Sequence, residues 1–114
     1  MATRSGDVHI CDASVTLAFS ILGKRWNGMI VSSLGAGPLS FAALRRSVDG
    51  ISDAVLSDRL SELADASLIE RNVDPGPPVA VGYTLTEGGR RLLPILDQLG
   101  AWAHDNLTAA QQKS

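Results

Sequence analysis

The side chains that could carry reactive chemistry in this chain are few and scattered. The one cysteine is Cys11, and the two histidines are His9 and His104. A metal site needs several such ligands at a suitable spacing, so these residues predict no metal site. The sequence contains no recognisable nucleophile and base, phosphate-binding loop or pair of carboxylates, and it therefore predicts neither an enzyme nor a bound cofactor.

Arginine offers a second kind of chemistry, the binding of phosphate. Arg45 and Arg46 are adjacent, and Arg59 follows in a leucine-rich segment. Guanidinium groups pair well with phosphate oxygens, so these residues favour contact with nucleic acid, with simple surface charge as the alternative. The net charge is −2, and residues 49–91 carry twice as many acidic as basic side chains. A DNA-binding surface would therefore have to be assembled locally.

Length and composition predict one compact domain. The chain has 114 residues, of which 45% are hydrophobic, and we expect a single domain over 1–114 with flexible segments at 1–10 and 108–114. A single cysteine excludes an intrachain disulfide. No apolar run is long enough for a membrane span, and the N-terminal segment lacks the apolar stretch of a signal peptide. We therefore expect a soluble, cytoplasmic protein with no membrane partner.

The spacing of apolar residues predicts a mostly helical fold with one β-hairpin. Ser40, Ser52 and Thr86 are suitable N-caps, and Gly50 can take a positive φ in the short turn before Ser52. Pro77 and Pro78 stiffen the tip of the hairpin. The expected elements are helices over 13–22 and 26–34, a helix after Ser40, a helix over about 52–66, strands over 68–73 and 79–85, and a last helix from Thr86 to about Leu107.

This order of elements describes a winged helix-turn-helix, in which the helix after Ser52 enters the DNA major groove. Its leucines form a buried stripe, and small or polar residues face outward. Small side chains let a helix lie close to base edges, and helix N-termini can bind phosphate. The predicted DNA-contacting residues are Ser40, Arg45, Arg46, Ser52, Ala54, Ser57, Asp58, Arg59, Pro77 and Pro78.

A series of motifs across residues 11–107 resembles the signature blocks of the HxlR-type regulators. They are AFSILGKRWNGMI from Ala18, GPLSF from Gly37, GIS from Gly50, LSDRLSEL from Leu56, LIER from Leu68 and YTLTEG from Tyr83. The resemblance implies a MarR-like winged-helix homodimer that binds pseudo-palindromic operators in double-stranded DNA. It also implies a dimer interface built by the first and last helices, where we expect Phe19, Leu96, Leu99, Trp102 and Leu107.

Within that family the block starting at Ala18 most resembles members that sense quinones and other thiol-reactive electrophiles. Those members carry a reactive cysteine just ahead of the first helix, at about the position of Cys11. A thiolate is the reactive species, and His9 or the N-terminus of the following helix could lower the pKa of the thiol. The alternative is that Cys11 is a small packing residue. Without a second cysteine, oxidation would give a Cys11 link between subunits, a mixed disulfide or an alkylated sulfur.

The sequence thus predicts a transcription regulator, a repressor that is released by a small-molecule effector or by modification of Cys11. An effector that acts without thiol chemistry is a further possibility. A different class of function is a winged-helix module that binds proteins and has lost affinity for DNA. The acidic middle of the chain favours it, as do Ala54 and Ala80, at positions where the family often carries a basic residue.

Overall fold

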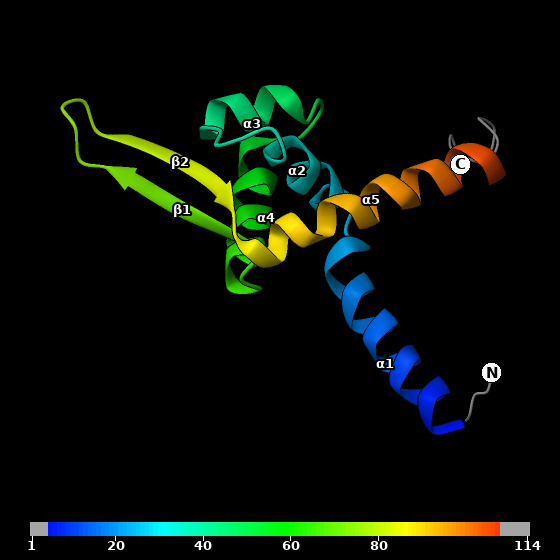
Figure 1. The fold of residues 1–114 in the computed structure, drawn as a ribbon. Helices are drawn as coiled ribbons and strands as arrows, with labels where there is room; N and C mark the ends of the chain where they lie inside the picture. Colours follow the sequence, from blue (N-terminus) through cyan, green and yellow to red (C-terminus); the bar gives the residue numbers. More distant parts are fainter. Residues whose placement is uncertain (1–4, 108–114) are drawn as a thin grey trace.

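A computed structural model describes residues 5–107 of the chain, with side chains from residue 13 onward. It is a winged helix-turn-helix, as the sequence predicts, with three helices and a hairpin between two longer terminal helices (Figure 1). The elements are α1 (Ser5–Leu22), α2 (Asn27–Leu34), α3 (Phe41–Ser47), α4 (Asp53–Asp65), β1 (Ile69–Asp74), β2 (Ala80–Leu85) and α5 (Glu87–Asn106).

One hydrophobic core lies between α2, α3, α4 and the base of the hairpin. The buried faces of α2 and α4 meet there, and Leu44 of α3 closes the cluster. Burial of such aliphatic side chains is the main favourable term in folding. The buried members are Ile30, Val31, Leu34, Leu44, Val48, Ile51, Leu56, Leu60, Leu63, Ile69 and Leu85.

Side-chain caps fix where three of the helices begin, as expected from the sequence. Ser40 Oγ accepts a hydrogen bond from Ala43 N at 3.1 Å, and Ser52 Oγ accepts one from Val55 N at 3.2 Å. Thr86 Oγ1 accepts one from Gly89 N at 3.1 Å. Each bond satisfies a backbone donor that has no partner within its helix.

The hairpin forms the wing. Strands β1 and β2 pair antiparallel, from Ile69 opposite Leu85 to Asp74 opposite Ala80. Before α3, Leu39 forms a single β-bridge with Tyr83, with its N donating to the Tyr83 carbonyl at 3.1 Å. The wing is therefore anchored to the loop that leads into α3.

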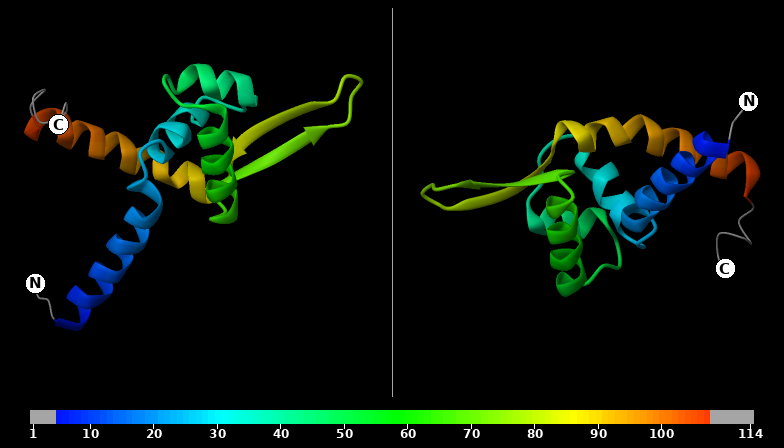
Figure 2. Two further views of the ribbon diagram at one scale, coloured as in Figure 1. Left: turned by 180° about the vertical axis from the view of Figure 1, so that it is seen from behind. Right: turned by 90° about the horizontal axis from the view of Figure 1, so that it is seen from below.

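The terminal helices and the wing extend from opposite sides of this body (Figures 1 and 2). The radius of gyration is 16.5 Å and the longest extent is 58 Å, whereas a compact domain of about 100 residues has a radius near 13 Å. Gly89 lets the first turn of α5 pass close to the Leu68 carbonyl, where a Cβ would not fit. The described helices include none that is both long and apolar enough to cross a membrane.

The start of α1 differs from the sequence expectation. We predicted a helix from residue 13, but the helix begins at Ser5. The predicted start followed the denser apolar spacing from Val15 to Leu22, although Val8 and Cys11 lie at helical spacing ahead of Val15 and extend the same pattern. Residues 1–4 and 108–114, the outer parts of the segments expected to be flexible, lie outside the described residues.

Candidate nucleic-acid interface

The turn between α3 and α4 sets the position of the helix predicted to bind DNA. Val48 N donates to Leu44 O at 2.9 Å and Ile51 N donates to Val48 O at 3.3 Å, and both side chains are buried. Gly50 lies between them with φ of 93°, a conformation that glycine adopts without strain. The turn is therefore anchored in the core on both sides of Gly50.

The outward face of α4 carries small and polar side chains, as predicted. Leu56, Leu60 and Leu63 are buried, whereas Ala54, Ser57 and Asp58 are exposed. The hydroxyl groups of Ser40 and Ser52 are engaged as N-caps at the exposed starts of α3 and α4. This face is open enough for a helix backbone to approach base edges.

The two adjacent arginines of α3, Arg45 and Arg46, differ in whether they form an ion pair. Arg45 Nη1 contacts both carboxylate oxygens of Asp53, at 2.9 and 3.2 Å. Arg46 is exposed, and the ion pairs found in the described part of the chain do not include it. Among the residues that the structure describes, Arg46 is thus a cation beside α4 without an ion pair, and Arg45 can reach phosphate only by leaving Asp53.

Arg59 lies differently from the sequence expectation of a residue that presents charge to DNA. Its guanidinium contacts Asp58 at 2.9 Å and Glu62 at 3.3 Å, and only 17% of its side chain is exposed. Its Nε atom is buried without a hydrogen-bond partner in the described residues. Its charge is therefore largely used within α4.

Glu62 in turn joins α4 to the corner between α1 and α2. Its carboxylate accepts hydrogen bonds from Lys24 at 2.7 Å and from Asn27 at 3.1 Å. The hydrogen bond from Lys24, followed by the one from Asn27, lowers the pKa of Glu62. Sequence reasoning missed this set of residues, because a polar residue in a helical pattern is ordinarily assigned to the solvent face.

The wing tip is exposed and carries little charge. Asp74 Oδ1 accepts a hydrogen bond from Gly76 N at 3.1 Å, which shapes the turn, and Pro77 and Pro78 follow in the open. Arg71, on the shaft of the wing, is an exposed cation that the sequence analysis did not single out. Its position in a strand gave no sign that it would be accessible.

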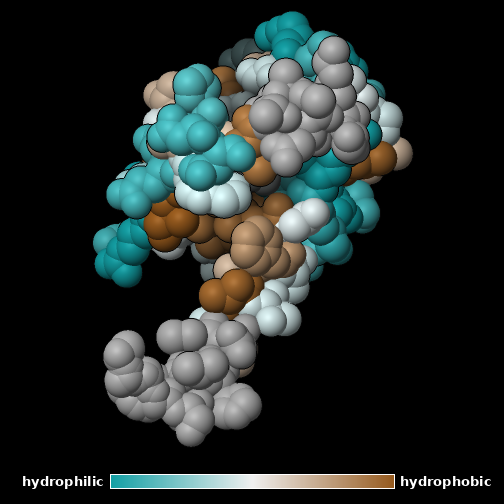
Figure 3. Space-filling view, turned by 90° about the vertical axis from the view of Figure 1, so that its right-hand side faces the viewer, coloured by the Kyte–Doolittle hydropathy of each residue, from teal (hydrophilic) through white to brown (hydrophobic). Residues whose placement is uncertain are grey.

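The two terminal helices expose apolar faces. Phe19 is 55% exposed and Trp102 is 54% exposed, while Leu99 and Leu107 are also exposed. Leu96, predicted at the same interface, packs partly against the core. Figure 3 shows apolar side chains gathered where α1 leaves the body of the molecule. Among the side chains that the structure describes, the exposed large apolar residues of α1, α5 and the C-cap of α5 are Val15, Leu17, Phe19, Ile95, Leu99, Trp102 and Leu107.

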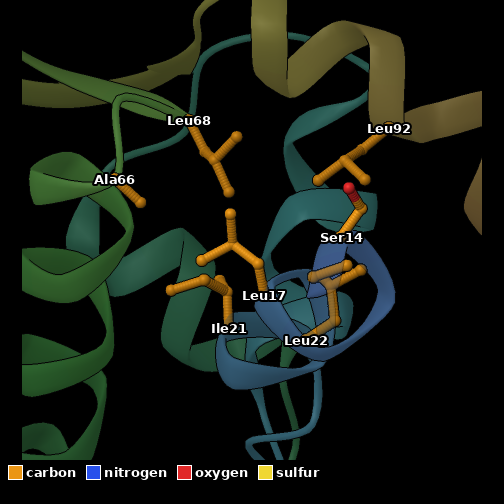
Figure 4. A pocket seen from close by; sticks show the side chains of 8 residues that line it. Ser14, Leu17, Ile21, Leu22, Ala66, Leu68 and Leu92 are labelled. Atoms are coloured by element: carbon orange, nitrogen blue, oxygen red, sulfur yellow. The ribbon is translucent and has the colours of Figure 1, made fainter. Parts of the chain in front are cut away.

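An apolar cavity lies beneath α1. It has a volume of about 430 Å³ and separates Leu17 and Ile21 of α1 from Leu68 and from Leu92 of α5 (Figure 4). Ser14, Ala18, Leu22 and Ala66 complete the lining. Such a cavity suits a small apolar molecule or apolar side chains.

Cys11 does not precede the first helix but lies within it, which corrects one part of the prediction. It is well past the first turn of α1 (Ser5–Leu22), where the helix dipole would favour a thiolate. The side chains of Cys11 and His9 lie outside those described.

Among the described residues, no group of three or more potential ligands could hold a metal ion.

The buried turn before α4, the open face of that helix and the anchored wing define a winged helix-turn-helix DNA-binding protein of the MarR-like type. Residues 21–111 match the HxlR-like helix-turn-helix family, and the chain belongs to it. It is a DNA-binding transcription regulator.

Individual relatives agree with this assignment. The HTH-type transcriptional regulator YodB of Bacillus subtilis (strain 168) is 45% identical over 86 residues, which cover 75% of this chain and 77% of YodB. The reduced form of YodB matches with a TM-score of 0.77 at 41% identity, covering 82% of this chain and 92% of the other. Quinone-bound YodB matches with a TM-score of 0.71 at 39% identity, and the match covers 81% of this chain and 96% of that YodB chain. The predicted resemblance to quinone-sensing members is thereby confirmed.

Proposed function

We propose that this chain is a homodimeric repressor that binds a pseudo-palindromic operator and is released when an electrophile such as a quinone, or another small molecule, acts on it. The single observation that carries the proposal is the pairing of an open, small-residue face on α4 with uncovered apolar faces on α1 and α5. The first surface fits a DNA groove, and the second fits another copy of the same surface.

In this proposal α4 reads bases in the major groove. Ala54 and Ser57 allow close approach, and the Asp58 carboxylate can accept a hydrogen bond from a cytosine amino group. Arg46 supplies the main phosphate contact, and Arg45 adds a second when it leaves Asp53. The remaining proposed contacts are those of Ser40, Ser52, Pro77 and Pro78. Arg59 is assigned no phosphate contact, because Asp58 and Glu62 hold its guanidinium group.

The dimer is proposed to form through α1 and α5. Phe19 and Trp102 are large aromatic residues of the kind that anchor interfaces, and both are more than half exposed in the single chain. Leu99 and Leu107 continue the apolar face, while Leu96 supports it from below. Two copies then present two α4 helices, which can enter major grooves about one DNA turn, or roughly 34 Å, apart.

The trigger is proposed to act on α1. YodB has been solved with quinone bound, and Cys11 is the one thiol of this chain. Its thiolate would add to a ring carbon of the quinone, and the electron pair would pass to a quinone oxygen, which takes up a proton to give a hydroquinone thioether. A second route for an effector is non-covalent binding in the cavity beneath α1. The cytoplasmic location and the lack of enzymatic activity stay predictions.

Selection from random DNA tests the DNA-binding part. We expect an enriched inverted repeat whose binding weakens with salt. Arg46→Ala should weaken binding roughly tenfold and reduce the salt slope by about 1. Arg91→Ala is the matched control, because Arg91 is exposed on α5 and pairs with Glu87. Unchanged binding in Arg46→Ala would refute the assigned face.

Treatment with a quinone tests the trigger. The unmodified protein should release its operator and gain one quinone mass, and Cys11→Ser should do neither. Release of the operator from Cys11→Ser by the same quinone would exclude the thiol as the sensor. That result would favour the cavity as the effector site.

A winged-helix module that binds proteins and has only weak affinity for DNA is the second candidate. The pairing of Arg45 with Asp53 and of Arg59 with Glu62 favours it, since both arginines are then partly neutralised. The absence of any enriched sequence in the random selection, together with salt-insensitive binding, would support this alternative.

A further inference from the structure

Four polar side chains form a cluster beneath the corner where α1 meets α2. Lys24 lies in the corner itself, Asn27 begins α2, and Arg59 and Glu62 lie on α4. Asn27 Nδ2 donates to the Ile21 carbonyl at 2.8 Å and to Glu62 Oε1 at 3.1 Å. Asn27 therefore connects the last turn of α1 to α4 through one amide group.

Asn27 is 0% exposed, although it is polar. Both hydrogen atoms of its Nδ2 are directed to acceptors, which fixes the orientation of the amide. Its Oδ1 is buried and has no partner among the described residues, a feature that costs free energy. An apolar residue would avoid this cost but would also remove both donors of the Nδ2 group. The distinctive property of Asn27 is that it joins two acceptors on different helices.

Glu62 completes the connection through its second oxygen. Glu62 Oε2 accepts from Lys24 Nζ at 2.7 Å, so the carboxylate is held by two residues of the corner. The contact of Arg59 Nη1 with Glu62 Oε1, at 3.3 Å, orients the carboxylate from within α4. The corner thus contacts α4 by two polar links on its C-terminal half.

The same corner also touches the turn that precedes α4. Trp26 packs beside Gly50, where a Cβ would lie 3.6 Å from Trp26 Cη2. Arg25 covers the Trp26 ring, with its guanidinium carbon 4.4 Å from the centroid. Residues 24–27 therefore contact α4 near its C-terminal end and also contact the turn at its start.

We propose that Asn27 and Glu62 are positioning residues that fix the angle between α1 and α4, and so carry a movement of the dimer helix to the DNA-binding helix. This inference rests on the proposed function, which makes α1 part of the dimer interface and α4 the DNA reader. A change at α1 then alters the spacing of the two α4 helices without any direct contact between the effector and α4. Loss of either residue uncouples the helices while leaving the apolar core intact.

Spin labels on α1 and α4 test the inference directly. Thr16→Cys and Ala64→Cys supply two exposed labelling positions, in a Cys11→Ser background. Labelled chains are diluted with unlabelled ones, so that the measured distance lies within one chain. The parent should give a single narrow distance, and Asn27→Ala and Glu62→Gln should each lose it and give a broad distribution. Glu87→Gln is the matched control, because it makes the same change in an exposed ion pair on α5.

A second measurement separates positioning from loss of structure. With the selected operator, the parent should bind tightly at one half-site spacing, and Glu62→Gln should bind that spacing roughly tenfold more weakly, while altered spacings lose little. A merely structural defect would weaken all spacings equally. A narrow, unchanged distance in both variants, or an unchanged spacing preference, overturns the inference.

Failure of the proposed function gives a different pattern. A chain that stays monomeric, or that selects no operator, refutes the proposed dimeric repressor whatever the label distance is. A dimer that binds an operator and keeps its narrow distance in Asn27→Ala and Glu62→Gln refutes only the positioning role.

Discussion

The helix-turn-helix and the terminal helices differ in how much of their large apolar side chains is exposed. In the first region, Leu44, Leu56 and Leu63 are completely buried by elements of the same chain. In the second, Phe19 and Trp102 are more than half exposed although they belong to long, regular helices. A single chain therefore buries the apolar core of its DNA-binding unit but leaves the apolar faces of its terminal helices exposed. We propose that a second copy of the chain covers these faces.

Truncation of the core should have the largest effect. Leu56→Ala removes a fully buried side chain, so it should lower the free energy of unfolding by about 3 kcal/mol. The loss should be independent of protein concentration, because this core lies within one chain. Urea denaturation at two concentrations measures it. Val79→Ala, at an exposed position on the wing, is the control and should change stability by less than about 0.5 kcal/mol. Equal losses in the two variants would contradict the description of the core.

Truncation of the terminal helices should affect association instead. Trp102→Ala should raise the dissociation constant of the dimer about 30-fold, corresponding to about 2 kcal/mol. Sedimentation equilibrium measures the constant, and circular dichroism should show unchanged helix content in the monomer. Asp97→Ala, on another side of α5, should leave association unchanged. An unaltered dimer in Trp102→Ala would remove this residue from the interface.

A smaller effect is expected at the DNA-binding unit. Asp53→Asn removes a carboxylate from the first turn of α4 and releases Arg45 from its ion pair. DNA binding should tighten severalfold at low salt, since one more cation becomes available to phosphate. Stability should fall by no more than about 1 kcal/mol through the lost charge at the helix N-terminus. Fluorescence anisotropy across a salt series checks the affinity, and weaker binding would show that Asp53 itself contacts a base.

The smallest expected effect is the dependence on pH of the stability that Glu62 provides where α4 contacts the corner between α1 and α2. The pKa of Glu62 is lowered by folding from its ordinary value of 4.5. The stabilisation from ionised Glu62 is therefore fully present above 4.5 and is lost as pH falls through the lowered pKa. The difference in stability between the parent and Glu62→Gln should be constant from about pH 8 to pH 5 and disappear in more acidic solution. A difference that grows toward acid would contradict the sign of the shift.

Local chemistry explains which parts of the fold the sequence could predict. Ser40, Ser52 and Thr86 cap helices because their hydroxyl groups act on neighbouring amides, and Gly50 is needed by a turn of fixed length. These features depend on residues close together in the chain. The winged helix-turn-helix could therefore be predicted with most of its boundaries, and membership of the family confirms it.

Contacts between distant segments explain what the sequence could not predict. The ion pair of Arg45 with Asp53 depends on how α3 crosses α4, and the burial of Asn27 depends on where α1 ends. Arg59 was expected to face DNA, but its neighbour Glu62 holds its charge on α4. The first turns of α1 were missed because the prediction began at the denser apolar run from Val15, and the helical position of Cys11 was missed with them.

The distance between the two α4 helices of a dimer tests the central claim most directly. Spin labels at Ala64→Cys, in a Cys11→Ser background, place one probe near the C-terminal end of each α4, about two turns from Ser57. We predict one principal distance near 34 Å between subunits, the length of about one DNA turn. No dipolar coupling between labels at concentrations that support DNA binding, or a distance far from that value when operator is bound, would contradict the account.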